Sequence, residues 1–169
     1  MALKTLALAA ALAGTAHAQT TYTGAAGHWR TFEGTTYGGD YTCGIQAILP
    51  NGTVTIRAFR NGFDFDLYSP SWHLPPGNGT VQINVDNRFW NWTTHIRNEN
   101  TVFVEVPVSD NDLGAFLPAL ATGSNLSWHW PNGTYGYVPL DGSSTAVAVL
   151  RNCYTQHFPS APADNGPRV

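Results

Sequence analysis

The stretch YTCGIQAILPNGTVTIRA, residues 41–58, decides the fold. Every second residue from Tyr41 to Leu49 is apolar, and the same alternation resumes from Val54 to Ala58. A period of two is typical of a β-strand that buries one face. Pro50-Asn51-Gly52 interrupts the alternation, and Asn-Gly tolerates the positive φ angles that a tight turn requires. The stretch therefore predicts a β-hairpin.

The same alternation recurs along the chain. It predicts further strands at residues 63–67, 81–85, 90–96, 102–106, 126–130 and 135–137. Turn residues separate them, at Asn61-Gly62, Asn78-Gly79, Asp86-Asn87-Arg88, Asn98-Glu99-Asn100 and Asn132-Gly133. The sequence therefore predicts a mainly β (α+β) fold. We expect about seven or eight strands in an antiparallel meander sheet, which forms a sandwich or partial barrel closed by two short helices.

Two segments depart from this period and predict the helices. In residues 110–123, Asp110 or Asp112 can cap the start of a helix, and Gly123 can end it. The apolar residues that fall on one face of this helix are Leu113, Phe116, Leu117 and Leu120. Pro118 lies inside this segment and costs about 3 kcal/mol there, so we expect a short or kinked helix. Residues 143–157 form the second helix, with Ser143 or Ser144 as its cap. Its predicted sheet-facing residues are Ala146, Val149, Leu150 and Cys153.

The first eighteen residues, MALKTLALAAALAGTAHA, have the pattern of an export signal. Lys4 precedes a short apolar run, and Ala16-His17-Ala18 is the small-x-small motif that signal peptidase recognises. No later apolar run is long enough to cross a bilayer, so we expect no stable membrane insertion after cleavage. The predicted organisation is a signal peptide at 1–18, one β-rich domain at 19–157, and a disordered tail at 158–169. We expect a periplasmic or secreted protein.

Two cysteines remain after the signal, Cys43 and Cys153. In an oxidising compartment the favoured state is one disulfide between them, tying an early strand to the last helix. Two buried free thiols and one reactive cysteine are the alternatives. Zinc needs further ligands at close spacing, and the sequence offers none. We expect no metal and no cofactor.

Charge excludes several partners. Lys4 is the only lysine and leaves with the signal, which leaves seven scattered arginines against eleven acidic residues. Without a basic stripe, binding to nucleic acid or to an anionic membrane surface is not expected. Without lysine, Schiff-base chemistry, Ser-Lys dyads and a P-loop are excluded. Gly142-Ser143-Ser144 lacks the G-x-S-x-G pattern, and the histidines are isolated, so no nucleophilic or metal motif predicts an enzyme.

Carboxylates are one candidate site. Asp64 and Asp66 lie two apart on one strand face, about 6.5–7 Å from each other, and Asp86 could join them from another strand. That spacing suits the two carboxyl groups of a glycosidase or the oxygens of a calcium site. A solvated strand face gives the same pattern, and this alternative stays open.

Aromatic residues are the other candidate. Trp90 with Trp92, and Trp128 with Trp130, form pairs on one strand face, and Trp72 lies in a loop. Exposed rings of this kind bind sugars, with Arg97 or Asp86 as a polar neighbour. Large aromatic residues of a small β-domain usually form its core, which is the alternative.

Trp29, followed by Cys43 on a long strand, and Leu140-Asp141-Gly142-Ser143-Ser144-Thr145-Ala146, followed by Cys153, resemble small exported bacterial proteins such as the invasion-associated locus B family. The family's additional early cysteine pairing is absent, so no site residues are carried over. The resemblance implies an accessory protein of the cell envelope or secreted fraction. With the residues above, it predicts an exported, non-catalytic binding or structural module with an unknown protein or glycan partner. A carbohydrate-binding module and a small carboxylate-dependent hydrolase are the alternatives.

Overall fold

The computed structural model describes residues 18–60, 62–107, 111–130 and 135–159. Within them the strands are β1 Gln19–Ala26, β2 Trp29–Thr35, β3 Tyr41–Leu49, β4 Gly52–Phe59, β5 Gly62–Tyr68, β6 Gly77–Val85, β7 Arg88–Asn98, β8 Thr101–Pro107, β9 Asn125–His129 and β10 Tyr135–Pro139. The helices are α1 Asn111–Thr122 and α2 Ser143–His157. The predicted signal up to residue 17 and the predicted tail from residue 160 lie outside the described residues.

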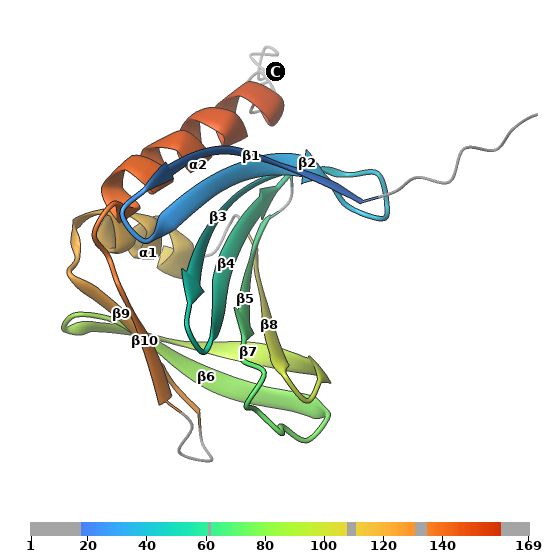
Figure 1. Cartoon of the computed structure of the whole chain (residues 1–169), viewed down its shortest axis with the longest axis vertical. Helices are drawn as coiled ribbons and strands as arrows, with labels where there is room; N and C mark the ends of the chain where they lie inside the picture. The colour runs from blue at the N-terminus through green and yellow to red at the C-terminus, as the bar shows by residue number, and fades with distance from the viewer. Residues whose placement is uncertain (1–17, 61, 108–110, 131–134, 160–169) are drawn as a thin grey trace, which may run out of the picture.

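The strands form one antiparallel sheet in the order β1-β2-β3-β4-β5-β8-β7-β6-β9-β10. The sheet curls into an open partial barrel, and α1 and α2 lie at one side of it (Figure 1). The predicted fold class is confirmed. Strands β6 to β8 join the sheet in reverse order, because the loop after β5 carries the chain past two strand positions before β6 begins.

The hairpin predicted at residues 41–58 is confirmed. Ile45 of β3 pairs with Ile56 of β4, and Ala47 pairs with Val54, so four apolar side chains face the core together. On the other side of the curl, β7 contributes Trp90 and Trp92 to that core. These two rings and Phe65 of β5 surround Phe116 of α1, with centroid distances to Phe116 of 5.0–6.0 Å. The core therefore fills the inside of the curled sheet.

Helix α1 carries Pro118 in its interior and buries Phe116, Leu117 and Leu120, as predicted. It ends at Thr122, where the Gly123 N–H donates to the Ala119 carbonyl at 2.8 Å. Asp110 and the side chains of Asp112 and Leu113 lie outside what the structure describes. The predicted cap and the predicted position of Leu113 therefore stay predictions.

Helix α2 begins differently from the prediction. Its N-cap is Gly142 at φ +84°, and neither Ser143 nor Ser144 caps it by a side-chain hydrogen bond. Ser143 is buried and its hydroxyl donates to the Leu120 carbonyl at 2.7 Å, which links α2 to α1. Val149 is exposed and Val147 is buried instead, because the helix is rotated toward Ala146, Val147 and Leu150.

The disulfide between Cys43 and Cys153 is confirmed, with its Cα atoms 6.0 Å apart. It joins β3 to α2. Phe158, just beyond the helix, is buried beside Tyr41 and Tyr154. Neither described helix combines the length and the apolar character that a membrane crossing requires.

Asn78-Gly79 does not form the predicted turn. Both residues lie inside β6, and Gly79 pairs with Thr94 of β7. A side chain at Gly79 would lie 3.3 Å from the Trp130 ring, so the glycine here allows close packing rather than a chain reversal. The turns at Asn51-Gly52, Asp86-Asn87 and Glu99-Asn100 are confirmed.

Candidate functional site

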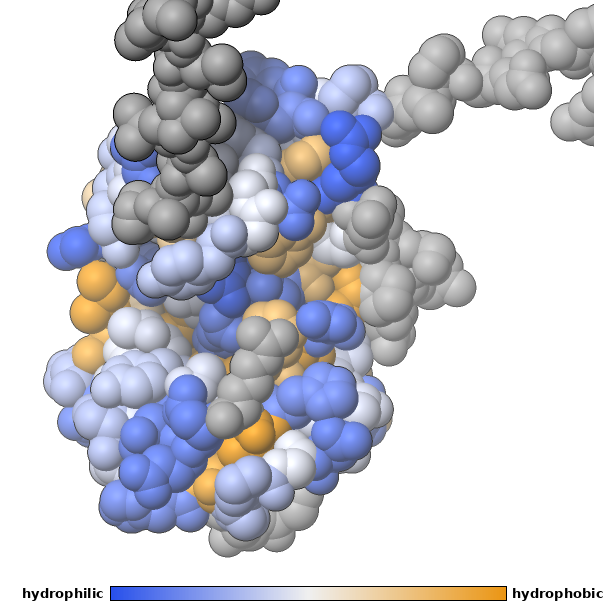
Figure 2. All heavy atoms as spheres, turned by 90° about the vertical axis from the view of Figure 1, so that its right-hand side faces the viewer, coloured by the Kyte–Doolittle hydropathy of each residue, from blue (hydrophilic) through white to orange (hydrophobic). Residues whose placement is uncertain are grey.

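The sheet has a hollow on the face opposite its core. On β3, β4, β5 and β8 most of the residues that alternate with the core are polar, such as Gln46, Thr55 and Glu105. Together with Phe59 and Phe103 they line a cavity of about 990 Å³. Figure 2 shows this side of the molecule, on which hydrophobic and hydrophilic residues lie next to one another. We call this hollow the outer groove, and its centre is Arg57, Asp64 and Asp66.

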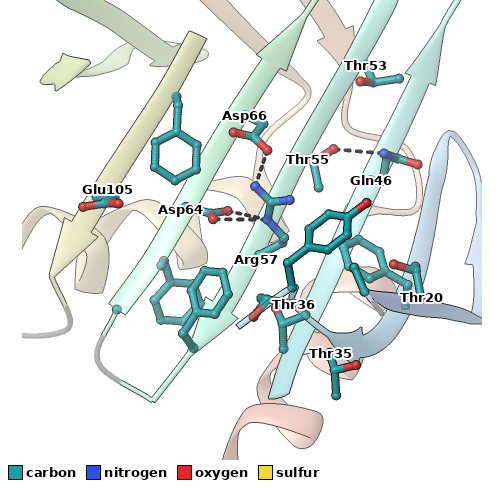
Figure 3. A pocket seen from close by; sticks show the side chains of 18 of the residues that line it. Thr20, Thr35, Thr36, Gln46, Thr53, Thr55, Arg57, Asp64, Asp66 and Glu105 are labelled. Carbon is teal, nitrogen blue, oxygen red and sulfur yellow. Dashed lines mark hydrogen bonds and ion pairs between the residues drawn. The ribbon is translucent and has the colours of Figure 1, made fainter. Parts of the chain in front are cut away.

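Arg57 binds both predicted carboxylates. It lies directly opposite Asp64 in the β4–β5 pair, and its Nε donates to Asp64 Oδ1 at 2.8 Å and to Oδ2 at 3.1 Å. A second guanidinium nitrogen, Nη2, donates to Asp66 Oδ2. Figure 3 shows the guanidinium between the two carboxylates. Asp64 is only 4% exposed, so this ion pair is largely shielded from water.

The interactions within this cluster favour the charged forms of its side chains. Burial alone would lower the pKa of Arg57, but the hydrogen bond to Asp64 and the charges of Asp66 and Asp64 outweigh it, so the pKa is raised above its ordinary value. A guanidinium in turn favours the charged form of an adjacent carboxyl group. A glycosidase needs one carboxyl group protonated as its acid. The cluster is therefore better suited to binding than to acid catalysis.

Polar side chains extend the cluster across the sheet. Tyr22 of β1 donates its hydroxyl to Gln46 Oε1 at 3.0 Å, and Gln46 Nε2 donates to Thr55 Oγ1 at 3.0 Å. Further threonines line the groove, among them those labelled in Figure 3: Thr20, Thr35, Thr36 and Thr53. The floor therefore offers uncharged donors and acceptors on both sides of Arg57.

Tyrosine rings form the rim. Tyr22, Tyr37 and Tyr68 line the groove and are 52%, 82% and 42% exposed. Phe32 lies across β3, where a side chain at Gly44 would come within 2.0 Å of its ring. In the sequence these tyrosines form no i, i+2 aromatic pair, so the alternation that singles out the tryptophans gives no signal for them.

The other predicted site residues do not meet here. Trp90 and Trp92 are buried in the core and present no ring face to solvent. Asp86 accepts hydrogen bonds from the backbone N–H groups of Ser124 and Asn125, at 3.0 Å each, and so holds the connection between α1 and β9. Trp72 lines a different cavity, and the side chain of Arg97 lies outside the described part of the chain. Among the described residues that line the outer groove there is no histidine.

A second titratable cluster lies beside the disulfide. Glu33, Cys153 and His157 bring three potential ligand atoms within 4.8 Å of one another, but the sulfur of Cys153 is bonded to Cys43 and is not a thiolate ligand. Tyr41 stacks on His157 and donates its hydroxyl to Glu33 Oε2 at 2.6 Å. These contacts therefore support the packing of α2 rather than a metal ion.

We expect Tyr41 to ionise well above the ordinary pKa of a tyrosine. Desolvation, the hydrogen bond to Glu33 and the Glu33 charge raise its pKa from 10.0 to about 12. The protonated phenol thus stabilises the fold below pH 10, and this stabilisation is lost as the pH rises toward 12. Phenolate absorbance should show one late step, which Tyr41→Phe removes and Glu33→Gln moves toward the ordinary value. A titration without a late step that Tyr41→Phe removes would contradict this.

Comparison with known proteins shows similarity at the level of the fold alone. No protein-family model and no curated protein matches the chain. The structure is similar to the crystal structure of invasion associated protein B from Bartonella henselae, with a TM-score of 0.54 and 17% sequence identity, over 80% of this chain and 99% of that one. The resemblance indicated by Trp29, Cys43 and the segment before Cys153 is therefore confirmed at the level of the fold.

Proposed function

We propose that this protein is an exported, non-catalytic binding module that holds an uncharged carbohydrate in the outer groove. The observation that carries the proposal is the combination of three exposed tyrosine rings with a polar floor in one hollow. A tyrosine ring offers an apolar face and a polar tip, which suits the two kinds of surface of a sugar ring.

The floor supplies the directional contacts that such a ligand needs. Binding sites typically place a small number of polar groups among apolar and aromatic ones to fix orientation. Here Gln46 is bonded to Thr55, and Arg57 is bonded to Asp64 and Asp66, so these side chains need little ordering on binding. The same interactions favour binding over hydrolysis, because both carboxylates are engaged with one guanidinium.

Export is supported by two features. The Cys43–Cys153 disulfide suits an oxidising compartment, and residues 1–18 have the sequence pattern of a removable signal. We infer a periplasmic or secreted location from them, with one β-rich domain starting near Gln19.

The proposal is tested by screening the purified protein on an array of neutral glycans and measuring the best binder by calorimetry. We expect Tyr22→Ala and Tyr37→Ala each to weaken that binding about tenfold, which corresponds to about 1.4 kcal/mol and is reasonable for one stacked ring. Phe89→Ala is the matched control, since Phe89 is an exposed aromatic residue outside the groove. The proposal fails if no neutral glycan binds, or if the control weakens binding as much as the two groove variants.

A further inference from the structure

The curled sheet does not close, and the gap between its two ends is held shut at one point. There the His28 N–H donates to the Asp141 carbonyl at 3.3 Å, and the His28 ring contacts the Asp141 carboxylate. The Trp29 indole N–H donates to the Pro139 carbonyl at 3.3 Å. Gly142 permits this approach, because a side chain there would lie 2.0 Å from the Ala26 carbonyl oxygen.

Beyond that point the gap widens into a cavity of about 510 Å³, which we call the seam. One wall is β10, the last strand of the sheet (Figure 1). The opposite wall is the β3–β4 turn with Ile48 and Asn51, and Trp72 lines the seam from the loop after β5. None of the described lining residues is Asp, Glu, Lys or Arg. The seam therefore suits an uncharged ligand.

Two residues of β10 direct their backbone N–H and C=O groups into the seam. The Leu140 N–H donates to the Ser124 carbonyl at 2.9 Å, which fixes the phase of the β9–β10 pair. In an antiparallel pair alternate residues bond to the partner strand, so Val138 and Gly136 face β9, while Tyr137 and Tyr135 face away. The Pro139 carbonyl follows the same alternation, since it accepts the Trp29 bond from across the gap.

Trp128 supplies a buried donor at the same place. Its side chain is 6% exposed, it lines the seam, and its indole N–H has no hydrogen-bond partner among the described residues. The edge of the ring that carries this N–H lies under Gly136, where a side chain would come within 2.2 Å of the ring. An unpaired buried donor costs free energy that a ligand acceptor would recover.

We propose that the seam binds an uncharged, extended peptide segment, which adds to the sheet as a strand beside β10. The main chain of Tyr135 and Tyr137 would bond to the segment, and the segment's side chain opposite Gly136 would present an acceptor to Trp128. A peptide is favoured over other uncharged ligands because its own donors and acceptors repeat at every second residue, about 6.8 Å, as do those of the β10 edge. This site adjoins the outer groove, with which it shares Thr53 and Tyr68, but its β10 edge and Trp128 belong to the seam alone.

The experiment is selection from a display library of random nine-residue peptides on the purified protein, followed by calorimetry with synthetic copies of the enriched peptides. Tyr137→Pro removes the seam-facing N–H and leaves the bonds to β9 in place, whereas Tyr137→Thr removes the ring and keeps that N–H. We expect the proline variant to bind about tenfold more weakly than the threonine variant, as for the loss of one hydrogen bond. Amide exchange at Tyr135 and Tyr137 should slow when the peptide binds.

Trp128→Phe is the second variant, in case the proline variant does not fold. It should weaken peptides that carry an acceptor side chain at the critical position and leave their alanine-substituted forms unchanged. The inference is overturned if selection enriches no peptide, if Tyr137→Pro and Tyr137→Thr bind equally, or if Trp128→Phe affects both peptide forms alike. Tyr22→Ala and Tyr37→Ala should leave peptide binding unchanged, so the seam and the outer groove are tested separately.

Discussion

Replacing both cysteines, Cys43→Ser with Cys153→Ser, should lower the free energy of unfolding by about 4–5 kcal/mol. The two residues are 110 positions apart, and closing a loop of that length in the unfolded chain accounts for a loss of this size. For a domain of about 150 residues, each kcal/mol corresponds to roughly 2–4 °C in Tm, so we expect Tm to fall by roughly 10–20 °C. Denaturant unfolding and calorimetry of the two proteins measure both quantities.

The place of the disulfide in the fold explains why the loss should be global. Cys43 is fully buried on β3, and Cys153 lies on α2, whose buried residues Ala146, Val147 and Leu150 cover the sheet. A reducing agent should destabilise the natural protein and leave the double variant unaffected, which separates loss of the covalent link from the effect of the substitutions. A loss of less than about 1 kcal/mol on reduction would show that the link does not limit the unfolded chain.

The central hairpin could be predicted because it depends on local pattern, and the disulfide because only one pairing of the cysteines is possible. The apolar alternation at residues 41–58 fixes which side chains are buried, and the turn fixes which residues pair. With two cysteines left after the predicted signal, only one intramolecular pairing exists. Helix α2 could also be placed from its local apolar pattern. Its rotation about its own axis could not be predicted, because Val147 and Val149 are equally apolar.

Strands β1 and β2 could not be predicted in this way. Gln19–Ala26 is largely exposed, so its side chains show no apolar alternation, and it is held mainly by its antiparallel pairing with β2. The order of β6 to β8 in the sheet could not be predicted either. Alternation indicates which face of a strand is buried, and it does not indicate which strand lies next to it.

The candidate site was predicted in part. Asp64 and Asp66 do share a face, as the two-residue spacing predicted. Arg57 was missed, although hairpin register could have found it, since β4 and β5 are joined by a tight turn and Arg57 then falls opposite Asp64. For the paired tryptophans the sequence leaves two interpretations open, an exposed sugar-binding face and the core, and the structure supports the core. Trp90 and Trp92 have the larger apolar area and are buried, and tyrosines form the rim.

Arg57→Met should destabilise the protein by roughly 2–3 kcal/mol. The methionine keeps an apolar stem of similar length and removes the guanidinium to which both Asp64 and Asp66 are bonded. Removing one partner of a fully buried pair costs about 3–5 kcal/mol, and the Arg57 side chain is 29% exposed, so solvent screening reduces the loss. Denaturant unfolding measures the change.

Two further variants show whether charge is the cause. Arg88→Met removes an exposed arginine at the start of β7 and should change stability by less than about 0.5 kcal/mol. Adding Asp64→Asn and Asp66→Asn to Arg57→Met should recover much of the loss, because the amides keep the carboxylate shape and bury no charge. If Arg57→Met is no less stable than Arg88→Met, the cluster does not stabilise the floor of the outer groove. If the asparagines recover nothing, the loss comes from packing. The charges of the cluster then do not hold the floor of the outer groove in place.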